Sequence, residues 1–393
     1  MNVNAADPFV LYDKNEKCFY CYATSNELAP KDKAFLIYKS LDGINFEFVG
    51  YAIDLNHKNI WGSTWFWAPE VYYNENNGFY YMFYSACLKK ELVKEYFYDD
   101  SFEETCKIGV AISKSPSGPF ININNRPIDY FPYDKSYKDI EKVSQDIFNL
   151  KNDNLLKNVK SGIHFPIIDA SLFFKDDRIF LFYSRCCYKN CLFDKKLNRF
   201  VEESNIALVE LNNDFWFTKE VIMPKIKDEY KYFNLKDNQR QDKYLDVINY
   251  KKEPQEWENA HINDYFKTNG ANKNRRWSEG STTFKVKDLD LYAILYSCNF
   301  YQNENYGVGI AFSKDGINDF KKYKNNPIIH QIKEINLYST GHGSLVILNN
   351  EMHYYFHGRD SLTATRSLYR CKININSIDD VKISDIIHCN LVK

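Results

Sequence analysis

Five stretches of the chain repeat one pattern of polar and apolar positions. Each begins with a polar residue, continues as an apolar run, crosses a short polar turn and returns as a strand rich in aromatic residues. Apolar runs on both sides of a short polar turn are typical of β-hairpins. The five stretches are "DPFVLYDKNEKCFYCYAT" from Asp7, "EVYYNENNGFYYMFYS" from Glu70, "DASLFFKDDRIFLFYS" from Asp169, "EGSTTFKVKDLDLYAILYS" from Glu279 and "HGSLVILNNEMHYYFHGR" from His342.

A further strand is predicted after each hairpin. The segments "FLIYKSLDGINFEF" (35–48), "IGVAISKSPSGPF" (108–120) and "VGIAFSKDGINDF" (308–320) resemble one another closely, and segments 205–217 and 367–375 take the same place more loosely. The repeating unit is therefore three or four antiparallel strands, which is the blade of a β-propeller. The sequence predicts an all-β fold, a β-propeller of five blades.

Two regions do not fit the blade pattern. Residues 134–160 hold apolar positions at helical spacing, and residues 225–275 are charged and lack the alternation of a strand. We interpret the segments near 121–166 and 225–275 as insertions between blades of a single domain, residues 1–393. The helical spacing is carried by Ile140, Val143, Ile147 and Leu150.

The residues that open the five stretches are expected to meet in space. In a propeller the first strand of each blade lines the central channel, so Asp7, Glu70, Asp169, Glu279 and His342 would converge at one end of it. Charged groups are costly to bury without a partner. Clusters of them are retained where shifted pKa values serve a reaction. The sequence therefore predicts a functional site on the propeller axis.

Charge and aromatic content indicate which classes of partner the protein can bind. The formal net charge is −1, from 51 basic and 52 acidic side chains, without a basic stripe. This argues against nucleic acids and anionic membranes as partners, and no apolar run is as long as a membrane span. Aromatic residues make up 17% of the chain, and they supply both sheet core and flat platforms for sugar rings.

The cysteines and the N-terminus bear on location. Cys18, Cys21, Cys87, Cys298 and Cys371 lie inside apolar strand-like runs, which indicates buried thiols in a reducing compartment. The "CFYC" motif resembles a metal or redox motif, but positions i and i+3 of a strand face opposite sides. The start "MNVNAADPF" lacks the basic and apolar regions of a signal peptide. We expect a cytoplasmic protein, although a secreted one trimmed of its signal would begin in the same way.

The motifs within these stretches resemble glycoside hydrolase family 43, over nearly the whole chain. They are "ADPF", "FWAPEVYY", "IGVAISKSPSGPF", "IDASLFF", "WSEGS", "GVGIAFSKDG", "TGHGS" and "YYFHGR", in this order. The resemblance implies Asp7 as the general base that activates water and Glu279 as the general acid that protonates the leaving oxygen. It implies Asp169 as the carboxylate that orients this acid and tunes its pKa.

The same resemblance implies two further residues of the site. His342, in "TGHGS", matches an axial histidine that in some members of the family helps to hold a calcium or sodium ion. Arg359, in "FHGR", matches an arginine that contacts the sugar beside the carboxylates. No organic cofactor is implied.

Other candidates for binding the substrate depend on their place in the repeats. Glu70 has no catalytic step in the resemblance, so its role is structural or in substrate binding. Aromatic residues crowd the loops before the second blade and after the fourth hairpin, where each could either stack on a sugar or belong to the core. The substrate-binding candidates are Trp65, Trp67, Glu70, Phe300 and Tyr301, with Trp61 and Phe66 in the same loop.

The expected activity is inverting hydrolysis of pentose-containing glycans or oligosaccharides, of the α-L-arabinofuranosidase or β-xylosidase type. An inverting enzyme sets a carboxylate base and a carboxylic acid about 6.5–9.5 Å apart, so that water fits beneath the sugar. After Arg359 the chain is long enough only to finish the last blade, so we expect no C-terminal sandwich domain. The alternatives are an exo-galactanase of the same fold, a sugar-binding propeller without catalysis and a protein-interaction propeller.

Overall fold

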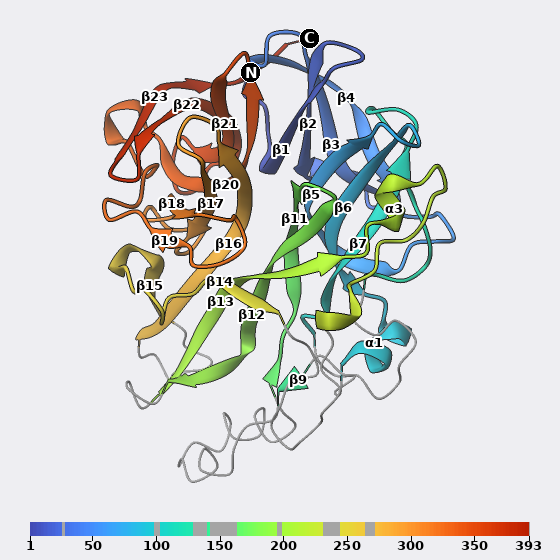
Figure 1. Ribbon diagram of the computed structural model, residues 1–393, viewed down its shortest axis with the longest axis horizontal. Helices are drawn as coiled ribbons and strands as arrows, with labels where there is room; N and C mark the ends of the chain where they lie inside the picture. The colour runs from blue at the N-terminus through green and yellow to red at the C-terminus, as the bar shows by residue number, and fades with distance from the viewer. Residues whose placement is uncertain are drawn as a thin grey trace.

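The computed structural model of the chain describes residues 1–25, 28–97, 103–128, 140–141, 163–194, 199–230, 244–263 and 272–392. Its strands form five groups of four around a common centre, and consecutive strands within each group pair antiparallel (Figure 1). The predicted β-propeller is confirmed. Each predicted hairpin forms the first two strands of one blade.

The blades follow one another in chain order. The first holds β1 (Ala6–Asp13), β2 (Cys18–Thr24), β3 (Lys33–Ser40) and β4 (Asn45–Asp54), and the second holds β5 (Gly62–Asn74), β6 (Phe79–Leu88), β7 (Cys106–Ser113) and β8 (Ile121–Asn122). The third holds β11 (Ile167–Lys175), β12 (Arg178–Asp194), β13 (Arg199–Leu211) and β14 (Leu245–Ile248), and the fourth holds β16 (Asn272–Val286), β17 (Leu291–Cys298), β18 (Gly307–Ser313) and β19 (Lys321–Lys322). The fifth holds β20 (Tyr338–Leu348), β21 (Glu351–Arg359), β22 (Ser367–Ser377) and β23 (Asp380–His388).

Short elements lie outside the blades. They are β9 (Ile140–Glu141), β10 (Ile163–His164), β15 (Asn259–Asn263), β24 (Asn390–Leu391), the helices α1 (Lys90–Tyr96) and α3 (Asp214–Phe217), and the 3₁₀ helices η3 (Asp228–Tyr230), η4 (Glu256–Glu258) and η5 (Lys333–Ile335).

Repeated turn chemistry explains why the third strands of two blades resemble each other in sequence. In "SLDGIN" the Asp42 carboxylate accepts the backbone N–H groups of Ile44 and Asn45, both at 2.8 Å. Asp315 in "SKDGIN" does the same for the two residues at its own positions +2 and +3, at 2.9 and 2.7 Å. A side chain that satisfies its own turn fixes the reversal locally. The sequence similarity is therefore a similarity of turns.

The core of the molecule lies between blades. Five clusters of buried apolar side chains each join two neighbouring blades, including the fifth and the first. The aromatic residue repeated in the second strand of each blade belongs to these clusters, which explains much of the aromatic content. These residues are Tyr22, Tyr84, Tyr183, Tyr296 and Phe356, and each is at most 1% exposed.

The two ends of the chain close the ring. The backbone of Val3 bonds to Cys389 and Leu368, and β24 pairs in parallel with β4 of the first blade. Both termini therefore lie side by side at the junction of the first and fifth blades (Figure 1). Closure at this junction holds β1 in the ring, and β1 carries Asp7.

The two expected insertions differ from the prediction where the structure describes them. Residues 245–248 form the outer strand β14 of the third blade, and β15 pairs with β16, so part of 225–275 belongs to the sheet. A strand of four residues is too short for its alternation to be recognised in the sequence. In 134–160, Ile140 lies in the strand β9 and not in a helix. The positions Val143, Ile147 and Leu150 lie outside the described residues.

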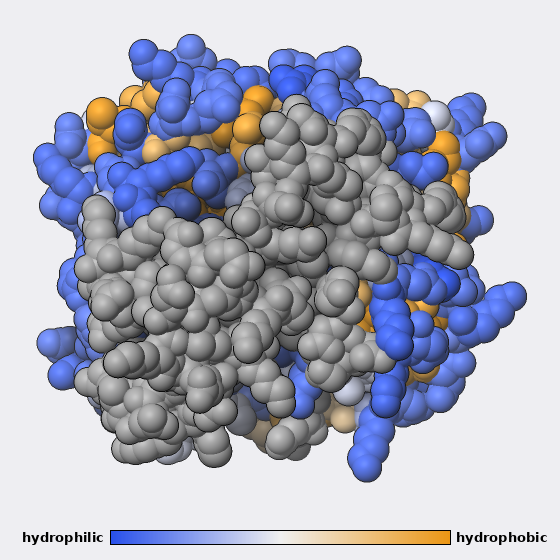
Figure 2. All heavy atoms as spheres, turned by 90° about the horizontal axis from the view of Figure 1, so that it is seen from below, coloured by the Kyte–Doolittle hydropathy of each residue, from blue (hydrophilic) through white to orange (hydrophobic). Residues whose placement is uncertain are grey.

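The cysteines, the helices and the surface also bear on the predictions made from the sequence. The eight cysteines whose side chains the structure describes are buried and free, which confirms the prediction of buried thiols at the five positions named above. Cys18 and Cys21 belong to different core clusters, as expected for strand positions i and i+3. In the described part of the chain, no helix has the length and apolar character needed to span a bilayer. The described residues seen from below are mainly hydrophilic (Figure 2).

Candidate active site

A β-bulge near the start of each inner strand shapes the site. In β1, β5, β11, β16 and β20 the pairing register shifts at corresponding places. One residue at each bulge adopts a left-handed backbone conformation, and a bulge of this kind turns a side chain in a new direction. These residues are Asp7, Ala68, Asp169, Gly280 and His342, with φ between 41° and 57°.

This alignment corrects the predicted equivalence of five polar residues. Asp7, Asp169 and His342 do occupy the same place in their blades. Glu279 stands one residue before its bulge, and Glu70 stands two residues after the bulge at Ala68. Each step of one residue along a strand moves the side chain about 3.3 Å along the strand and turns it to the opposite face of the sheet. Glu279 therefore faces the main cavity, whereas Glu70 faces a smaller space beneath it.

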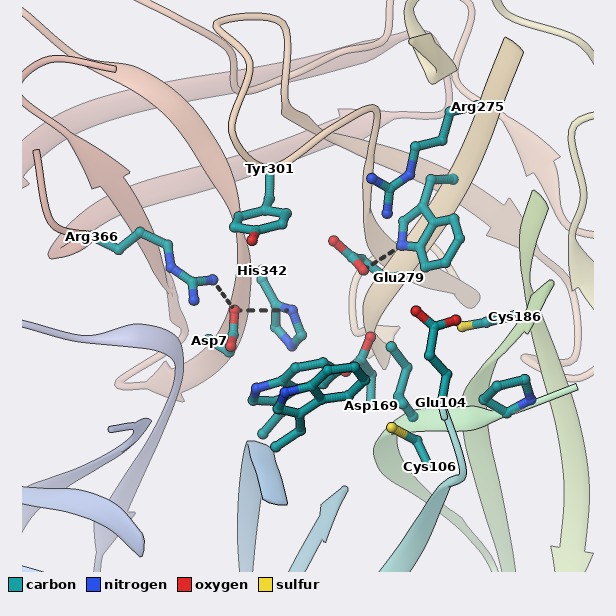
Figure 3. Close-up of a pocket in the computed structure, with 15 residues that line it drawn as sticks. Asp7, Glu104, Cys106, Asp169, Cys186, Arg275, Glu279, Tyr301, His342 and Arg366 are labelled. Atoms are coloured by element: carbon teal, nitrogen blue, oxygen red, sulfur yellow. Dashed lines mark hydrogen bonds and ion pairs between the residues drawn. The ribbon is translucent and has the colours of Figure 1, made fainter. Parts of the chain in front are cut away.

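The main cavity lies where the inner strands converge, and it has a volume of about 530 Å³. The side chains of Asp7, Asp169 and Glu279 point into it from the first, third and fourth blades (Figure 3). The described residues that line it are Asp7, Trp65, Trp67, Glu104, Cys106, Pro166, Ile168, Asp169, Cys186, Arg275, Trp277, Glu279, Tyr301, His342 and Arg366.

Asp7 is surrounded by groups that favour its charged form. Its Oδ1 lies 2.7 Å from Nη1 of Arg366 and 3.5 Å from Nδ1 of His342, and its backbone N–H donates to Nδ1 of His357 at 3.2 Å. Burial alone would raise the pKa of Asp7, but the charge of Arg366, with smaller contributions from the two histidines, outweighs burial. The net effect holds the pKa of Asp7 well below its usual range, so this carboxyl is ionised.

Asp169 has the opposite surroundings. Its backbone N–H donates to Oγ of Ser85 at 2.9 Å, and the Ser184 hydroxyl donates to its Oδ2 at 3.0 Å. Burial is the main cause that raises the pKa of Asp169 to about 7; the negative charges of Glu279 and Asp7 act in the same direction, and His342 acts against them. Near pH 7 the Asp169 carboxyl is therefore protonated in about half of the molecules.

Glu279 is held in place by two donors. Nε1 of Trp277 donates to one carboxylate oxygen at 2.6 Å, and the hydroxyl of Tyr306 donates to the other at 2.7 Å. The next residue, Gly280, allows His342 to approach, because a Cβ there would lie 2.7 Å from Cγ of the imidazole. The small residue in "SEGS" thus brings the histidine beside the carboxylates.

Arg366, which sequence reasoning missed, occupies the place expected for Arg359. Arg359 is not among the residues that line the cavity, and its guanidinium donates to the carbonyl of Ala364. This bond closes the short loop that leads to Arg366. The segment "TATRS" offers no motif that would have identified Arg366, since its contact with Asp7 joins positions 359 residues apart.

The aromatic candidates separate into two groups. Trp65 and Trp67 line the cavity and stack on each other, with ring centroids 5.1 Å apart and 9° between their planes. Trp65 is 41% exposed and has a left-handed backbone, φ 55°, which costs about 1–2 kcal/mol for a residue with a side chain. Tyr301 also lines the cavity. Trp61 and Phe66 belong to the core between the first two blades.

Phe300 does not line the cavity, and it supports a residue that does. The centre of its ring lies 4.7 Å from Cζ of Arg275, which also lies 4.2 Å from the centre of the Trp277 ring. Arg275 and Trp277 come from "RRWSEGS", so part of the missed wall was adjacent in sequence to the predicted acid. Glu104 was missed as well, because it precedes β7 in a segment without a repeat motif, and it is 3% exposed at the cavity wall.

Glu70 lines the smaller space beneath the site together with Asp7, Asp169 and His342. This space has a volume of about 10 Å³, close to the size of one water molecule. The Tyr72 hydroxyl donates to the Glu70 carboxylate. Burial raises the pKa of Glu70 to about 8, with a smaller contribution from the charge of Asp169. Glu70 therefore carries a proton at neutral pH.

The side chains around His342 bear on the calcium or sodium ion that the resemblance implies for some members of the family. Nδ1 of His342 is directed toward Asp7, and the described residues contain no group of three or more His, Cys, Asp or Glu side chains that could hold a metal ion. The side chains around His342 do not by themselves form a metal site. No step of the reaction proposed below is assigned to a metal.

Comparisons with known proteins bear on the family and the fold. Residues 1–138 match the family model described as glycosyl hydrolases family 43, whereas no curated protein matches the chain. An endo-1,4-β-xylanase from Bacteroides thetaiotaomicron VPI-5482 has a similar structure, with a TM-score of 0.64, 24% identity and coverage of 100% of this chain and 98% of the other.

Two further solved structures share the fold at lower identity. An α-L-arabinanase of Cellvibrio cellulosa, in complex with arabinohexaose, has a TM-score of 0.57 and 13% identity, and covers 98% of this chain and 96% of its own. A family 43 β-1,3-galactosidase, in complex with galactodeoxynojirimycin, has a TM-score of 0.56 and 14% identity, with coverage of 99% and 96%. Residues 1–138 thus support the resemblance to glycoside hydrolase family 43, and the solved structures show the same fold over the whole chain.

Proposed function

We propose that the chain is an inverting glycoside hydrolase that acts on pentose-containing glycans or oligosaccharides, of the α-L-arabinofuranosidase or β-xylosidase type. One observation carries the proposal. A single cavity combines an ionised carboxylate, Asp7, with a pair of carboxyl groups, Asp169 and Glu279, that repel each other's charge. Acid–base hydrolysis requires a base and a proton donor whose surroundings give them different pKa values.

The residues divide the reaction between them. Asp7, ionised beside Arg366, accepts a proton from the attacking water. Glu279, oriented by Trp277 and Tyr306, donates a proton to the leaving oxygen. Asp169 keeps that proton on the pair, because losing it would place two negative charges together in a buried site. The water attacks the anomeric carbon as the bond to the leaving oxygen breaks, which inverts the configuration.

The sugar class is inferred from the solved structures that share the fold. Two of the similar structures are described as a xylanase and an arabinanase, and the third as a galactosidase. Pentose polymers are therefore the first choice and galactans the second. The stacked Trp65 and Trp67 supply a flat apolar surface at the cavity, which suits a sugar ring of either kind.

The test is hydrolysis of a panel of aryl α-L-arabinofuranosides, β-xylosides and β-galactosides, each with a good and a poor leaving phenol. We expect cleavage of a pentoside, with the product first appearing in the inverted anomeric form by NMR. Glu279→Ala should lose about 100- to 10,000-fold in kcat on the poor leaving group, and less on the good one. Glu220→Ala, at an exposed position that does not line the cavity, is the matched control.

Three outcomes would contradict parts of this proposal. A retained anomeric configuration would exclude Asp7 as a base acting through water. Cleavage of galactosides alone would replace the sugar class. Binding of oligosaccharides without cleavage of any substrate would favour a sugar-binding propeller.

A further inference from the structure

A cluster of thiols forms part of the cavity wall, and the proposed reaction does not use it. Cys87, Cys106 and Cys186 pack together with Ile168 and Trp277, and Trp67 packs against them from the cavity side. We name this group the thiol cluster. Cys106 and Cys186 line the main cavity, on the side where Glu104 and Glu279 also lie (Figure 3). The cluster is therefore buried from bulk solvent but borders the space that substrate would fill.

Two of these thiols are already close enough to react with each other. Sγ of Cys87 lies 3.3 Å from Sγ of Cys106, and the two residues are direct partners across β6 and β7. The neighbouring N–H of Leu88 donates to the carbonyl of Thr105. In an antiparallel ladder this makes Cys87 and Cys106 a non-hydrogen-bonded pair, whose Cα atoms are about 4.5 Å apart. That separation falls within the range of about 4.4–6.8 Å that a disulfide spans.

We propose that Cys87 and Cys106 form an oxidisable thiol pair, which small peroxides reach through the substrate cavity and convert to a disulfide. Sulfur of Cys106, the member that lines the cavity, attacks one peroxide oxygen. The O–O bond breaks, water leaves, and Cys106 becomes a sulfenic acid. Sulfur of Cys87 then attacks that sulfur and expels a second water. Two thiols lose two electrons and two protons, and one hydrogen peroxide becomes two waters.

The chemistry of the pair sets its rate. The hydrogen bond with Cys87 and burial both raise the pKa of Cys106 well above its usual range. The negative charges of Cys186 and Glu104, if they form, act in the same direction. Because the thiolate is the attacking form, oxidation is slow at neutral pH. The pair is thus a site of gradual modification under sustained exposure to peroxide.

A disulfide here would affect the proposed active site through two tryptophans. Trp277 belongs to the thiol cluster and donates to Glu279, and Trp67 packs on the cluster and stacks with Trp65. Closing the gap between Cys87 and Cys106 moves atoms in a close-packed wall, where neighbouring side chains must shift in response. We expect hydrolysis to fall at least tenfold. This effect rests on the proposed function, whereas the formation of the disulfide does not.

The test incubates the purified protein with hydrogen peroxide at pH 8 and follows three readouts. Mass spectrometry of the unreduced digest should show one peptide linked through Cys87 and Cys106, two hydrogens lighter than the separate peptides. Tryptophan fluorescence should change with the same time course, and dithiothreitol should reverse both. Hydrolysis of the best aryl glycoside should fall in parallel.

Two variants separate the pair from general oxidation. Cys87→Ala should form no link and keep its starting activity and fluorescence under peroxide. Cys371→Ala, which removes a buried thiol between the fourth and fifth blades, should behave as wild type. A link that involves any other cysteine, or no link at all, would overturn the proposal. A link without a change in fluorescence or hydrolysis would overturn its connection to the site. If no glycoside is cleaved, the linked peptide and the fluorescence still decide.

Discussion

The two sides of the cavity hold carboxyl groups in opposite electrostatic surroundings. On the side of the first and fifth blades, Asp7 contacts the guanidinium of Arg366 and lies beside two histidines. On the side of the third and fourth blades, Asp169 and Glu279 receive hydrogen bonds from neutral hydroxyl and indole groups. The first side stabilises negative charge, and the second side resists it.

The difference shows how one cavity supplies both a base and a proton donor from similar side chains. Residues at the same bulge position, Asp7 and Asp169, acquire shifts of pKa in opposite directions. The blade repeat alone would make them alike. What separates them is the neighbouring blade that each one faces, since Arg366 comes from the fifth blade and the Glu279 carboxylate from the fourth. The asymmetry that catalysis needs is therefore added to a repeating scaffold.

Among the residues that surround the three carboxyl groups, the largest effect is expected from removing the positive charge beside Asp7. Arg366→Ala should lower kcat/KM about 10- to 100-fold, the usual worth of a hydrogen bond to a charged group. Burial would then be opposed only by the smaller contributions of His342, His357 and Thr24, so the pKa of Asp7 should rise. The acid limb of the pH profile of kcat/KM should move to higher pH, so the loss should be largest at low pH. A profile between pH 4 and 9 measures both effects.

Arg359→Ala is the matched comparison for Arg366→Ala. Arg359 lies in the same blade but contacts a carbonyl, so its removal should leave the acid limb in place. Arg366→Lys, which keeps the charge, should recover part of the shift. Equal changes in Arg359→Ala and Arg366→Ala would show that the arginines act only through the structure of their loop.

A smaller effect concerns the stability of the fold and comes from Glu70, beneath the site. The pKa of Glu70 is about 8 in the fold, above its ordinary value of 4.5. Its contribution to stability is complete below pH 4.5 and is lost progressively as pH rises toward 8, because the unfolded chain gives up this proton first. Glu70→Gln removes that loss. We compare the thermal midpoint of Glu70→Gln with that of wild type at each pH. The difference, variant minus wild type, should be about 2–4 °C larger at pH 8 than at pH 5.

Calorimetry at several pH values measures this difference, and Glu220→Gln serves as the exposed control. A constant difference between wild type and Glu70→Gln across the range would show that Glu70 is ionised in the fold. The Tyr72 hydroxyl would then be the group that stabilises the charge.

The sequence predicted the repeat and the site residues that stand within it. The hairpins, the closed ring and the meeting of Asp7, Asp169, Glu279 and His342 at one cavity agree with the pattern of polar residues before apolar runs. The sequence did not predict how far along the propeller axis each of these residues lies. A bulge of one residue cannot be recognised in an alignment of apolar runs. Glu70 was therefore expected to meet the other four residues, but it stands two residues after its bulge and lines the smaller space beneath them.

What the sequence could not predict depends on contacts between distant segments. Arg366 and Glu104 lie outside the motifs, and only the packing of neighbouring blades brings them to the cavity. Cys106 was not recognised either, because its partner Cys87 is 19 residues away in another strand and its importance arises from the register between them. Long-range register is a property of the fold and not of a local pattern.

The smallest effect is expected at the rim, which both sides of the cavity share. Trp65→Ala should raise KM about fivefold with little change in kcat, as expected from the loss of about 1 kcal/mol of aromatic contact with the sugar. Trp65→Phe should recover part of the affinity. The control Phe217→Ala removes an aromatic ring that is 49% exposed and does not line the cavity. A fall in kcat equal to the rise in KM would contradict a role in binding alone. It would indicate that the left-handed backbone at Trp65 positions Trp67, and through it the wall beside Glu279.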